Sequence, residues 1–250
     1  KEKMDITDVV SVSGAISEVN PDIIINCAAY NLVDEAEENS DLAYGVNGKA
    51  LENLSAVCKK NNIFLVHYSS DYVFDGTKED FYNEDDIPNP LSVYGKSKLN
   101  GEKIIEENLS DYLIFRVSWV FGEGKNNFLY KAYQLAKTTK VLKISADEVS
   151  IPTYTEDIVN TTLLSLKKGL KGLYHLSSNG YSSRYELVKY FMLKMEVENI
   201  ILPVSRTELE NKAQRPKFSG LSTNKISNEL GTLLPFWENS VNKFVMVCDW

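Results

Sequence analysis

Residues 63–70, Ile63-Phe64-Leu65-Val66-His67-Tyr68-Ser69-Ser70, form a short apolar run that ends in two serines. A continuous run of this length is typical of a strand buried on both faces of a parallel sheet. Similar runs lie at 23–29, which ends in Cys27-Ala28-Ala29, and at 113–121. We expect three buried strands.

Helical patterns separate and follow these runs, over residues 5–20, 34–60 and from Tyr94 onward. Strands that alternate with helices predict βαβ units, and therefore an α/β fold with a doubly wound parallel sheet. Beyond residue 140 we expect strands at 141–144, 173–176 and 200–204, and helices at 155–170 and 184–194. These later elements predict a smaller C-terminal α/β lobe.

Ligands of such sheets bind outside the carboxyl ends of the strands. Three predicted strand ends carry candidate residues, at 27–30, 69–72 and 118–119. We expect them to meet in one cleft. Ala28 and Ala29 are small enough to let a flat or extended ligand approach the backbone, although tight packing of a strand against a helix explains them equally well.

Tyr94 and Lys98 stand four residues apart at the head of a predicted helix, so both side chains can face one site. A nearby ammonium lowers the pKa of a phenol towards working pH, which suits a general acid or base. The same spacing also occurs by chance on solvated helices. Ser70 could hydrogen-bond a substrate oxygen beside the phenol.

Composition narrows the function classes. The chain has 250 residues, 25% of them charged, and a formal net charge of −8, which argues against a nucleic-acid partner. It has no apolar run long enough to span a membrane and no apolar signal sequence, so we expect a cytoplasmic protein. Three cysteines without metal-ligand spacing imply neither disulfides nor a metal site. His67 and His175 lie in apolar runs, and we interpret both as core residues.

Several motifs together resemble the extended short-chain dehydrogenase/reductases, and among them the dTDP-4-dehydrorhamnose reductases. They span nearly the whole chain: Ser69-Ser70-Asp71-Tyr72-Val73-Phe74-Asp75-Gly76, Tyr94-Gly95-Lys96-Ser97-Lys98, Arg116-Val117-Ser118-Trp119-Val120-Phe121-Gly122 and Arg215-Pro216. The resemblance implies a Rossmann-like dinucleotide-binding domain at 1–140. It also implies a mainly substrate-binding lobe at 141–250, some segments of which return to the main domain.

The implied reaction is NADPH- or NADH-dependent reduction of the C4 keto group of dTDP-4-dehydro-6-deoxy-L-mannose to give dTDP-L-rhamnose. The implied catalytic residues are Ser70, Tyr94 and Lys98, with serine where the family usually has threonine. The implied cofactor contacts are Asp5, Ile6, Cys27, Ala28, Ala29, Tyr30, Asn31, Tyr94 and Lys98. The implied substrate contacts are Ser70, Asp71, Tyr72, Trp119 and Arg215, although Arg215 could equally form a surface ion pair. A homodimer is left open.

The sequence departs from the family in two places. Arg184 stands where the family often has tryptophan, and no Gly-x-x-Gly-x-x-Gly turn is present to hold a pyrophosphate. We therefore expect the first βα unit to be missing, with an N-terminal segment preceding residue 1 in the natural protein. The preference between NADPH and NADH stays open, because the residues that decide it lie partly in that segment.

Two other functions fit the same motifs. An epimerase or dehydratase of this fold would use Tyr94 and Lys98 but retain bound NAD. A non-catalytic relative, resembling the regulatory subunit of methionine adenosyltransferase, would bind a partner enzyme instead. The missing glycine turn favours the second alternative, whereas the intact Ser70, Tyr94 and Lys98 set disfavours it.

Overall fold

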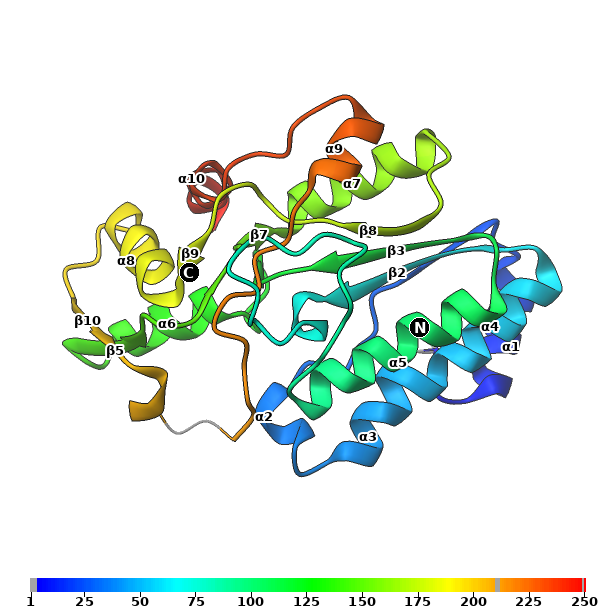
Figure 1. The fold of residues 1–250 in the computed structure, drawn as a ribbon, viewed down its shortest axis with the longest axis horizontal. Coiled ribbons are helices and arrows are strands. Elements are labelled where there is room, and N and C mark those ends of the chain that lie inside the picture. The colour runs from blue at the N-terminus through cyan, green and yellow to red at the C-terminus, as the bar shows by residue number, and fades with distance from the viewer. Residues whose placement is uncertain (1–3, 210–211, 249) are drawn as a thin grey trace.

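A four-stranded sheet lies at the centre of the computed structural model, which describes residues 4–209, 212–248 and 250. The strand order is β1-β2-β3-β8 and every neighbouring pair is parallel (Figure 1). The strands are β1 (Ile23–Asn26), β2 (Phe64–Ser70), β3 (Tyr112–Val117) and β8 (Gly172–His175). The α/β prediction with a parallel sheet is confirmed.

Helices cover both faces of this sheet (Figure 1). One face carries α1 (Val9–Val19), α4 (Ala50–Asn61) and α5 (Val93–Asn108); the other carries α7 (Thr155–Lys167) and α9 (Asn224–Leu230). Leu65 of β2 packs into the first core and its neighbour Val66 into the second. Successive strand residues point to opposite faces, so both are buried and the strand reads as a continuous apolar run.

Two predicted elements differ from the structure. β1 is not buried on both faces: it lies at the sheet edge, and Ile23 and Ile25 are each 43% exposed. The helix expected over 34–60 is divided into α2 (Val33–Ala36), α3 (Ser40–Tyr44), a π-helical turn (Gly45–Lys49) and α4. The π-helical turn lies against α5, whose Gly101 leaves room for the Asn47 carbonyl.

The run predicted as one strand over 113–121 also divides, because the backbone turns at Trp119, where φ is +37°. β3 ends at Val117, and β4 (Val120–Phe121) pairs instead with β7 (Thr153–Tyr154). A left-handed conformation at a non-glycine residue costs about 1–3 kcal/mol and is retained only where the surroundings enforce it. This conformation turns the chain out of the central sheet after β3, so that β4 pairs with β7.

A second core lies beside the carboxyl ends of the strands. It contains the parallel pair β5 (Val141–Ser145) and β10 (Ile200–Val204), with α6 (Phe128–Ala136), α8 (Arg184–Lys194) and α10 (Trp237–Val247). A short antiparallel pair, β6 (Val149–Ser150) with β9 (Ser182–Ser183), leads into α8. Short 3₁₀ turns occupy Asp71–Val73 and Arg206–Glu208.

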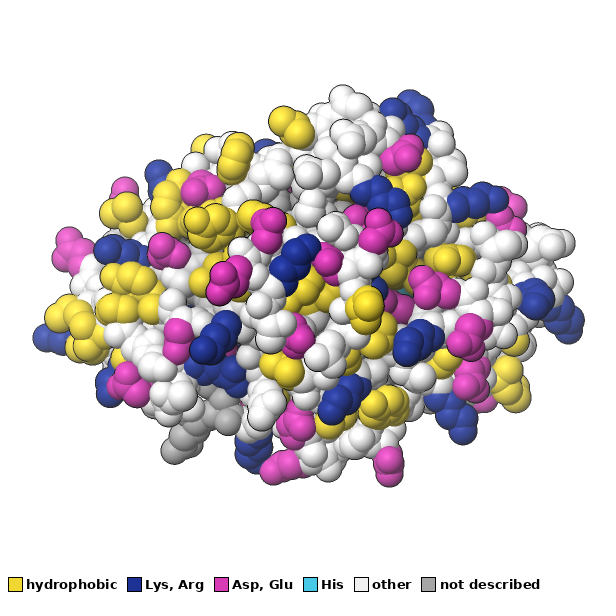
Figure 2. All heavy atoms as spheres, in the orientation of Figure 1, with side chains coloured by type: hydrophobic (Ala, Val, Ile, Leu, Met, Phe, Trp, Pro, Cys, Tyr) yellow, Lys and Arg dark blue, Asp and Glu magenta, His cyan; other side chains and the backbone are white. Residues whose placement is uncertain are grey.

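The surface is mixed in charge. On the face shown in Figure 2, lysines and arginines alternate with aspartates and glutamates over most of the area. Within the described part of the chain, no helix combines the length and apolar character needed to cross a membrane.

Candidate active site

A cavity of about 590 Å³ opens at the carboxyl ends of β1, β2 and β3. The predicted residues that line it are Cys27, Ala28, Ala29, Asn31, Ser70, Asp71, Tyr94, Lys98 and Trp119. They come from all three predicted strand ends and from α5. The structure therefore brings the strand ends and the Tyr94 helix to one cleft.

The start of α5 places Tyr94 and Lys98. The hydroxyl of Ser92 accepts a hydrogen bond from the Gly95 amide at 3.1 Å and caps the helix, so that Tyr94 lies in its first turn. A Cβ on Gly95 would fall well inside contact distance of the Tyr72 carbonyl oxygen. Glycine at this position lets α5 approach the Asp71–Val73 turn closely enough for Tyr94 to join the cavity.

Lys98 is almost completely buried, at 2% exposure. Its ammonium donates to the Tyr68 carbonyl oxygen at 2.6 Å, beside the end of β2. Burial lowers the pKa of Lys98 to about 8, and the carboxylate of Glu102 only partly opposes this shift. A buried amine with this pKa is protonated at neutral pH but close to losing its proton.

Tyr94 differs from the expectation drawn from its spacing. Burial raises the pKa of its phenol, and the hydrogen bond with Ser70 only partly lowers it. Lys98 was expected to lower this pKa, but its ammonium is engaged by the Tyr68 carbonyl. The Tyr94 hydroxyl lies 3.4 Å from the side-chain oxygen of Asn31, a weak hydrogen bond. Tyr94 is therefore protonated at neutral pH, which is the form in which a phenol can donate a proton.

Asp71 forms the floor of the cavity and is 2% exposed. Its carboxylate accepts hydrogen bonds from Ser70 at 3.1 Å, Ser150 at 2.9 Å and Ser219 at 2.6 Å. Burial raises the pKa of Asp71. The three hydroxyl donors favour the charged carboxylate and lower the pKa, but they only partly offset the effect of burial. One carboxylate thus joins the end of β2 to two segments from the second half of the chain.

A buried ion pair supports α5 from behind. Arg116 on β3 donates to both carboxylate oxygens of Glu102, at 3.0 and 2.7 Å, and both side chains are at most 4% exposed. His175 lies next to Arg116, and burial followed by the arginine charge lowers its pKa to about 3. His67 is also buried, which lowers its pKa well below the ordinary value. Both histidines are neutral core residues, as interpreted from the sequence.

A second cavity of about 560 Å³ adjoins the first and shares Asn31, Asn126 and Asn127 with it. Four cationic side chains, Lys131, Lys143, Arg184 and Arg215, line this second cavity together with the carboxylates of Asp34, Glu35 and Glu148. The guanidinium of Arg215 forms two hydrogen bonds to the Asp34 carboxylate, at 3.0 and 2.5 Å. Burial opposes ionisation of Asp34, but the hydrogen bonds from Arg215 and the nearby backbone lower its pKa. Arg215 is thus an ion-paired residue in the wall of a cavity of mixed charge.

The indole of Trp119 stands at the junction of these two cavities. The guanidinium carbon of Arg184 lies 4.1 Å from the Trp119 ring centroid and 4.6 Å from that of Phe128. A cation over an aromatic face contributes about 0.5–2 kcal/mol. That range overlaps the cost of the left-handed backbone at Trp119.

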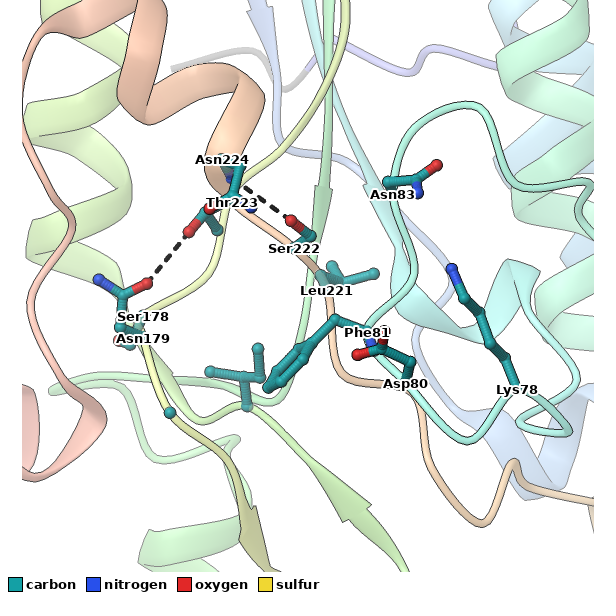
Figure 3. A pocket seen from close by; sticks show the side chains of 12 residues that line it. Lys78, Asp80, Phe81, Asn83, Ser178, Asn179, Leu221, Ser222, Thr223 and Asn224 are labelled. Atoms are coloured by element: carbon teal, nitrogen blue, oxygen red, sulfur yellow. Dashed lines mark hydrogen bonds between the residues drawn. The ribbon is translucent and has the colours of Figure 1, made fainter.

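A third cavity, of about 340 Å³, lies between the 78–83 loop and the start of α9 (Figure 3). Its polar groups are already engaged: Thr223 donates to the Asn179 side chain, and the Asn224 amide donates to Ser222. Neither Tyr94 nor Lys98 lines it. The first two cavities therefore form the candidate active site.

Four predicted contacts do not line these cavities. Asp5 is exposed and accepts from Thr7, and Ile6 packs into the core beneath α4. Tyr30 exchanges backbone hydrogen bonds with the Asn47 side chain. Tyr72 is buried behind Tyr94, with ring centroids 5.8 Å apart.

Sequence reasoning missed the residues that hold the predicted ones in place. Ser150 and Ser219 donate hydrogen bonds to Asp71, from which they are 79 and 148 residues distant along the chain. A local sequence pattern cannot predict such contacts. Glu148 was also missed; it pairs with Arg184 and Arg206, at 3.0 and 2.9 Å. Arg184 was noted only as a departure from a family pattern.

Comparison with known proteins agrees with this geometry. The family model for the RmlD substrate binding domain matches residues 1–249. The spore coat polysaccharide biosynthesis protein SpsK of Bacillus subtilis is 36% identical over all of this chain and 89% of its own length. The dTDP-4-dehydrorhamnose reductase of Salmonella typhimurium is 33% identical over 96% of this chain and 84% of its own. A solved dTDP-4-dehydrorhamnose reductase from Bacillus anthracis, in complex with NADP, is 34% identical with a TM-score of 0.94, covering 97% of this chain and 86% of that one.

Proposed function

The chain belongs to the RmlD substrate binding domain family, and we propose that it reduces the C4 keto group of dTDP-4-dehydro-6-deoxy-L-mannose to give dTDP-L-rhamnose. It is an NAD(P)H-dependent oxidoreductase, like the reductases that it resembles over nearly its whole length. The observation that carries the proposal is the meeting of Ser70, Tyr94 and Lys98 in one cavity at the carboxyl ends of the sheet.

The first cavity fits the nicotinamide end of a dinucleotide. Ala28 and Ala29 leave the backbone of the first strand end open to the cavity. The buried hydroxyl of Ser69 lines the same cavity and has no hydrogen-bond partner among the described residues. Together with Lys98, it offers polar groups to a ribose or a carboxamide. When bound, NADPH or NADH supplies the hydride that reaches C4.

The protein's own residues manage the proton. Tyr94 carries it on the phenol oxygen and gives it to the C4 oxygen as negative charge develops there. Ser70 can donate to the same oxygen by turning its single hydroxyl proton from the Asp71 carboxylate towards the substrate, where it shares the charge. The ammonium of Lys98 is held by the Tyr68 carbonyl oxygen and lines the same cavity as Tyr94. Because burial raises the pKa of Tyr94, the proton stays on the phenol until negative charge develops on the C4 oxygen of the substrate.

The second cavity fits the nucleotide part of the substrate. Lys131, Lys143 and Arg215 offer positive charge to a diphosphate in a protein whose net charge is −8, whereas the guanidinium of Arg184 is held by Glu148 and lies over the Trp119 ring. Trp119 and Asp71 line the first cavity with Tyr94, and Trp119 also contacts Arg184 of the second cavity, so we place the sugar beside these residues. This arrangement supports substrate-contact roles for Asp71, Trp119 and Arg215.

Turnover of the proposed substrate tests the assignment. We expect the protein to oxidise NADPH or NADH in step with dTDP-L-rhamnose formation, followed by loss of the reduced nicotinamide absorbance. Tyr94→Phe should reduce kcat at least about 100-fold. Tyr181→Phe is the matched control and should stay close to wild type, because Tyr181 is 60% exposed and lines neither cavity of the site. Product formation without net cofactor oxidation would indicate an epimerase or dehydratase. A folded protein of native length without turnover would refute the proposal.

Three further properties are proposals of the same kind. We propose a cofactor-binding part up to residue 140 and a mainly substrate-binding part beyond it. The two parts interlock, since Phe121, Leu129 and Ala132 pack into the second core and β8 joins the main sheet. We propose a cytoplasmic location, supported by the absence of disulfides among the described residues. We also propose a homodimer, which sedimentation would test.

A further inference from the structure

Arg184 is held on several sides at the junction of the two cavities. Its Nε donates to Glu148 at 3.0 Å, and its backbone amide donates to the Glu148 carbonyl. The same carboxylate accepts Arg206 at 2.9 Å and is only 7% exposed. A buried carboxylate between two guanidinium groups has little freedom to move.

The helix that carries Arg184 is equally fixed at its start. Ser183 and Glu186 form a reciprocal capping box, in which each side chain accepts from the other's backbone amide. Arg184 is the first residue of α8 and follows Ser183 directly. Its guanidinium therefore projects from a rigid helix end into the gap between Trp119 and Phe128.

Trp119 needs such support. Its backbone is left-handed, and only one backbone hydrogen bond of the described residues reaches its carbonyl, from Thr153 at 3.3 Å. The indole is partly exposed and lines the cavity that contains Tyr94. The cation–π contact with Arg184 is the contact that joins this ring to the charged wall of the second cavity.

We propose that Arg184 is a positioning residue that holds the Trp119 indole against the sugar ring of the substrate, so that it governs selection of the sugar rather than of the nucleotide. This proposal rests on the proposed function. Arg184 acts through Trp119, and Glu148 sets the orientation of its guanidinium.

Affinities for dTDP-L-rhamnose and for dTDP test the proposal by calorimetry. Arg184→Met should weaken dTDP-L-rhamnose binding about tenfold and leave dTDP binding within about twofold. Arg184→Lys keeps the charge but not the planar group, so its affinity for dTDP-L-rhamnose should lie between those of the wild type and Arg184→Met. Lys189→Met is the matched control, since Lys189 lies over Tyr185 on the exposed side of the same helix. It should change neither affinity.

A double-mutant cycle separates action through Trp119 from direct contact with the ligand. In a Trp119→Ala background, Arg184→Met should produce no further loss of dTDP-L-rhamnose affinity. Additive losses, an equal loss of dTDP affinity, or no loss from Arg184→Met would each overturn the proposal.

A ligand-free measurement keeps the proposal separate from the proposed function. The emission of Trp119 is obtained by subtracting the spectrum of the matching Trp119→Ala protein. Arg184→Met should lower the anisotropy of this emission, whether or not the protein binds a nucleotide sugar. Unchanged anisotropy would overturn the positioning role, whereas failure of the wild type to bind dTDP-L-rhamnose would count against the proposed function alone.

Discussion

We expect buried Lys98 to lower the free energy of unfolding, although the protein needs this residue for activity. Burial lowers its pKa from 10.5 to about 8, a difference worth about 3 kcal/mol at neutral pH. Lys98→Met removes this penalty but also removes the hydrogen bond to the Tyr68 carbonyl, a loss of about 1.5–3 kcal/mol. The two effects nearly cancel, so we expect Lys98→Met to unfold within about 1–2 kcal/mol of wild type at pH 7.5 while losing turnover.

The dependence of stability on pH isolates the burial effect. Between about pH 8 and 10.5 the unfolded chain binds a proton at Lys98 that the folded chain has released, so the unfolding free energy rises with pH. We expect the wild type to gain about 2 kcal/mol over Lys98→Met between pH 7.5 and 9.5.

Urea unfolding of both proteins at several pH values measures this gain. Lys96→Met is the matched control, because Lys96 lies on the same helix with its side chain exposed. Its difference from wild type should not vary with pH. A pH-independent difference between wild type and Lys98→Met would refute a lowered pKa at Lys98.

Three further predictions concern the same helix and its supports. Gly95→Ala should displace α5, destabilise the fold by about 1–3 kcal/mol in thermal melts and reduce turnover. The control Gly14→Ala, in open space on α1, should stabilise the fold by about 0.5–1 kcal/mol, and equal melting temperatures of the two variants would contradict this prediction. Arg116→Met should cost about 3–5 kcal/mol in urea unfolding because Glu102 stays buried without its partner, and a loss below about 1 kcal/mol would show that the pair is dispensable. The kcat profile should fall above about pH 8 as Lys98 loses its proton, and a flat profile to pH 10 would exclude that role.

The central strands and the meeting of their ends could be predicted from local sequence. Leu65 and Val66 point into different cores, so the run reads as apolar throughout, and Tyr94 and Lys98 face one cavity because of helical geometry. The pKa of Tyr94 could not be predicted, since burial depends on which distant segments cover the helix. The bend at Trp119 was missed for the same reason, because its support comes from α8.

Asp71 also constrains the order in which the molecule can mature. The hydrogen bonds to its carboxylate form only when Ser150 and Ser219 reach it, which closes chain separations of 79 and 148 residues. Contacts so distant along the chain form late, because the entropy of loop closure must be met before they stabilise anything. During synthesis the N-terminal helices and strands can pack while residue 219 is still to be added. We therefore expect the floor of the cavity to form late in folding, so that activity appears only after the central sheet has assembled.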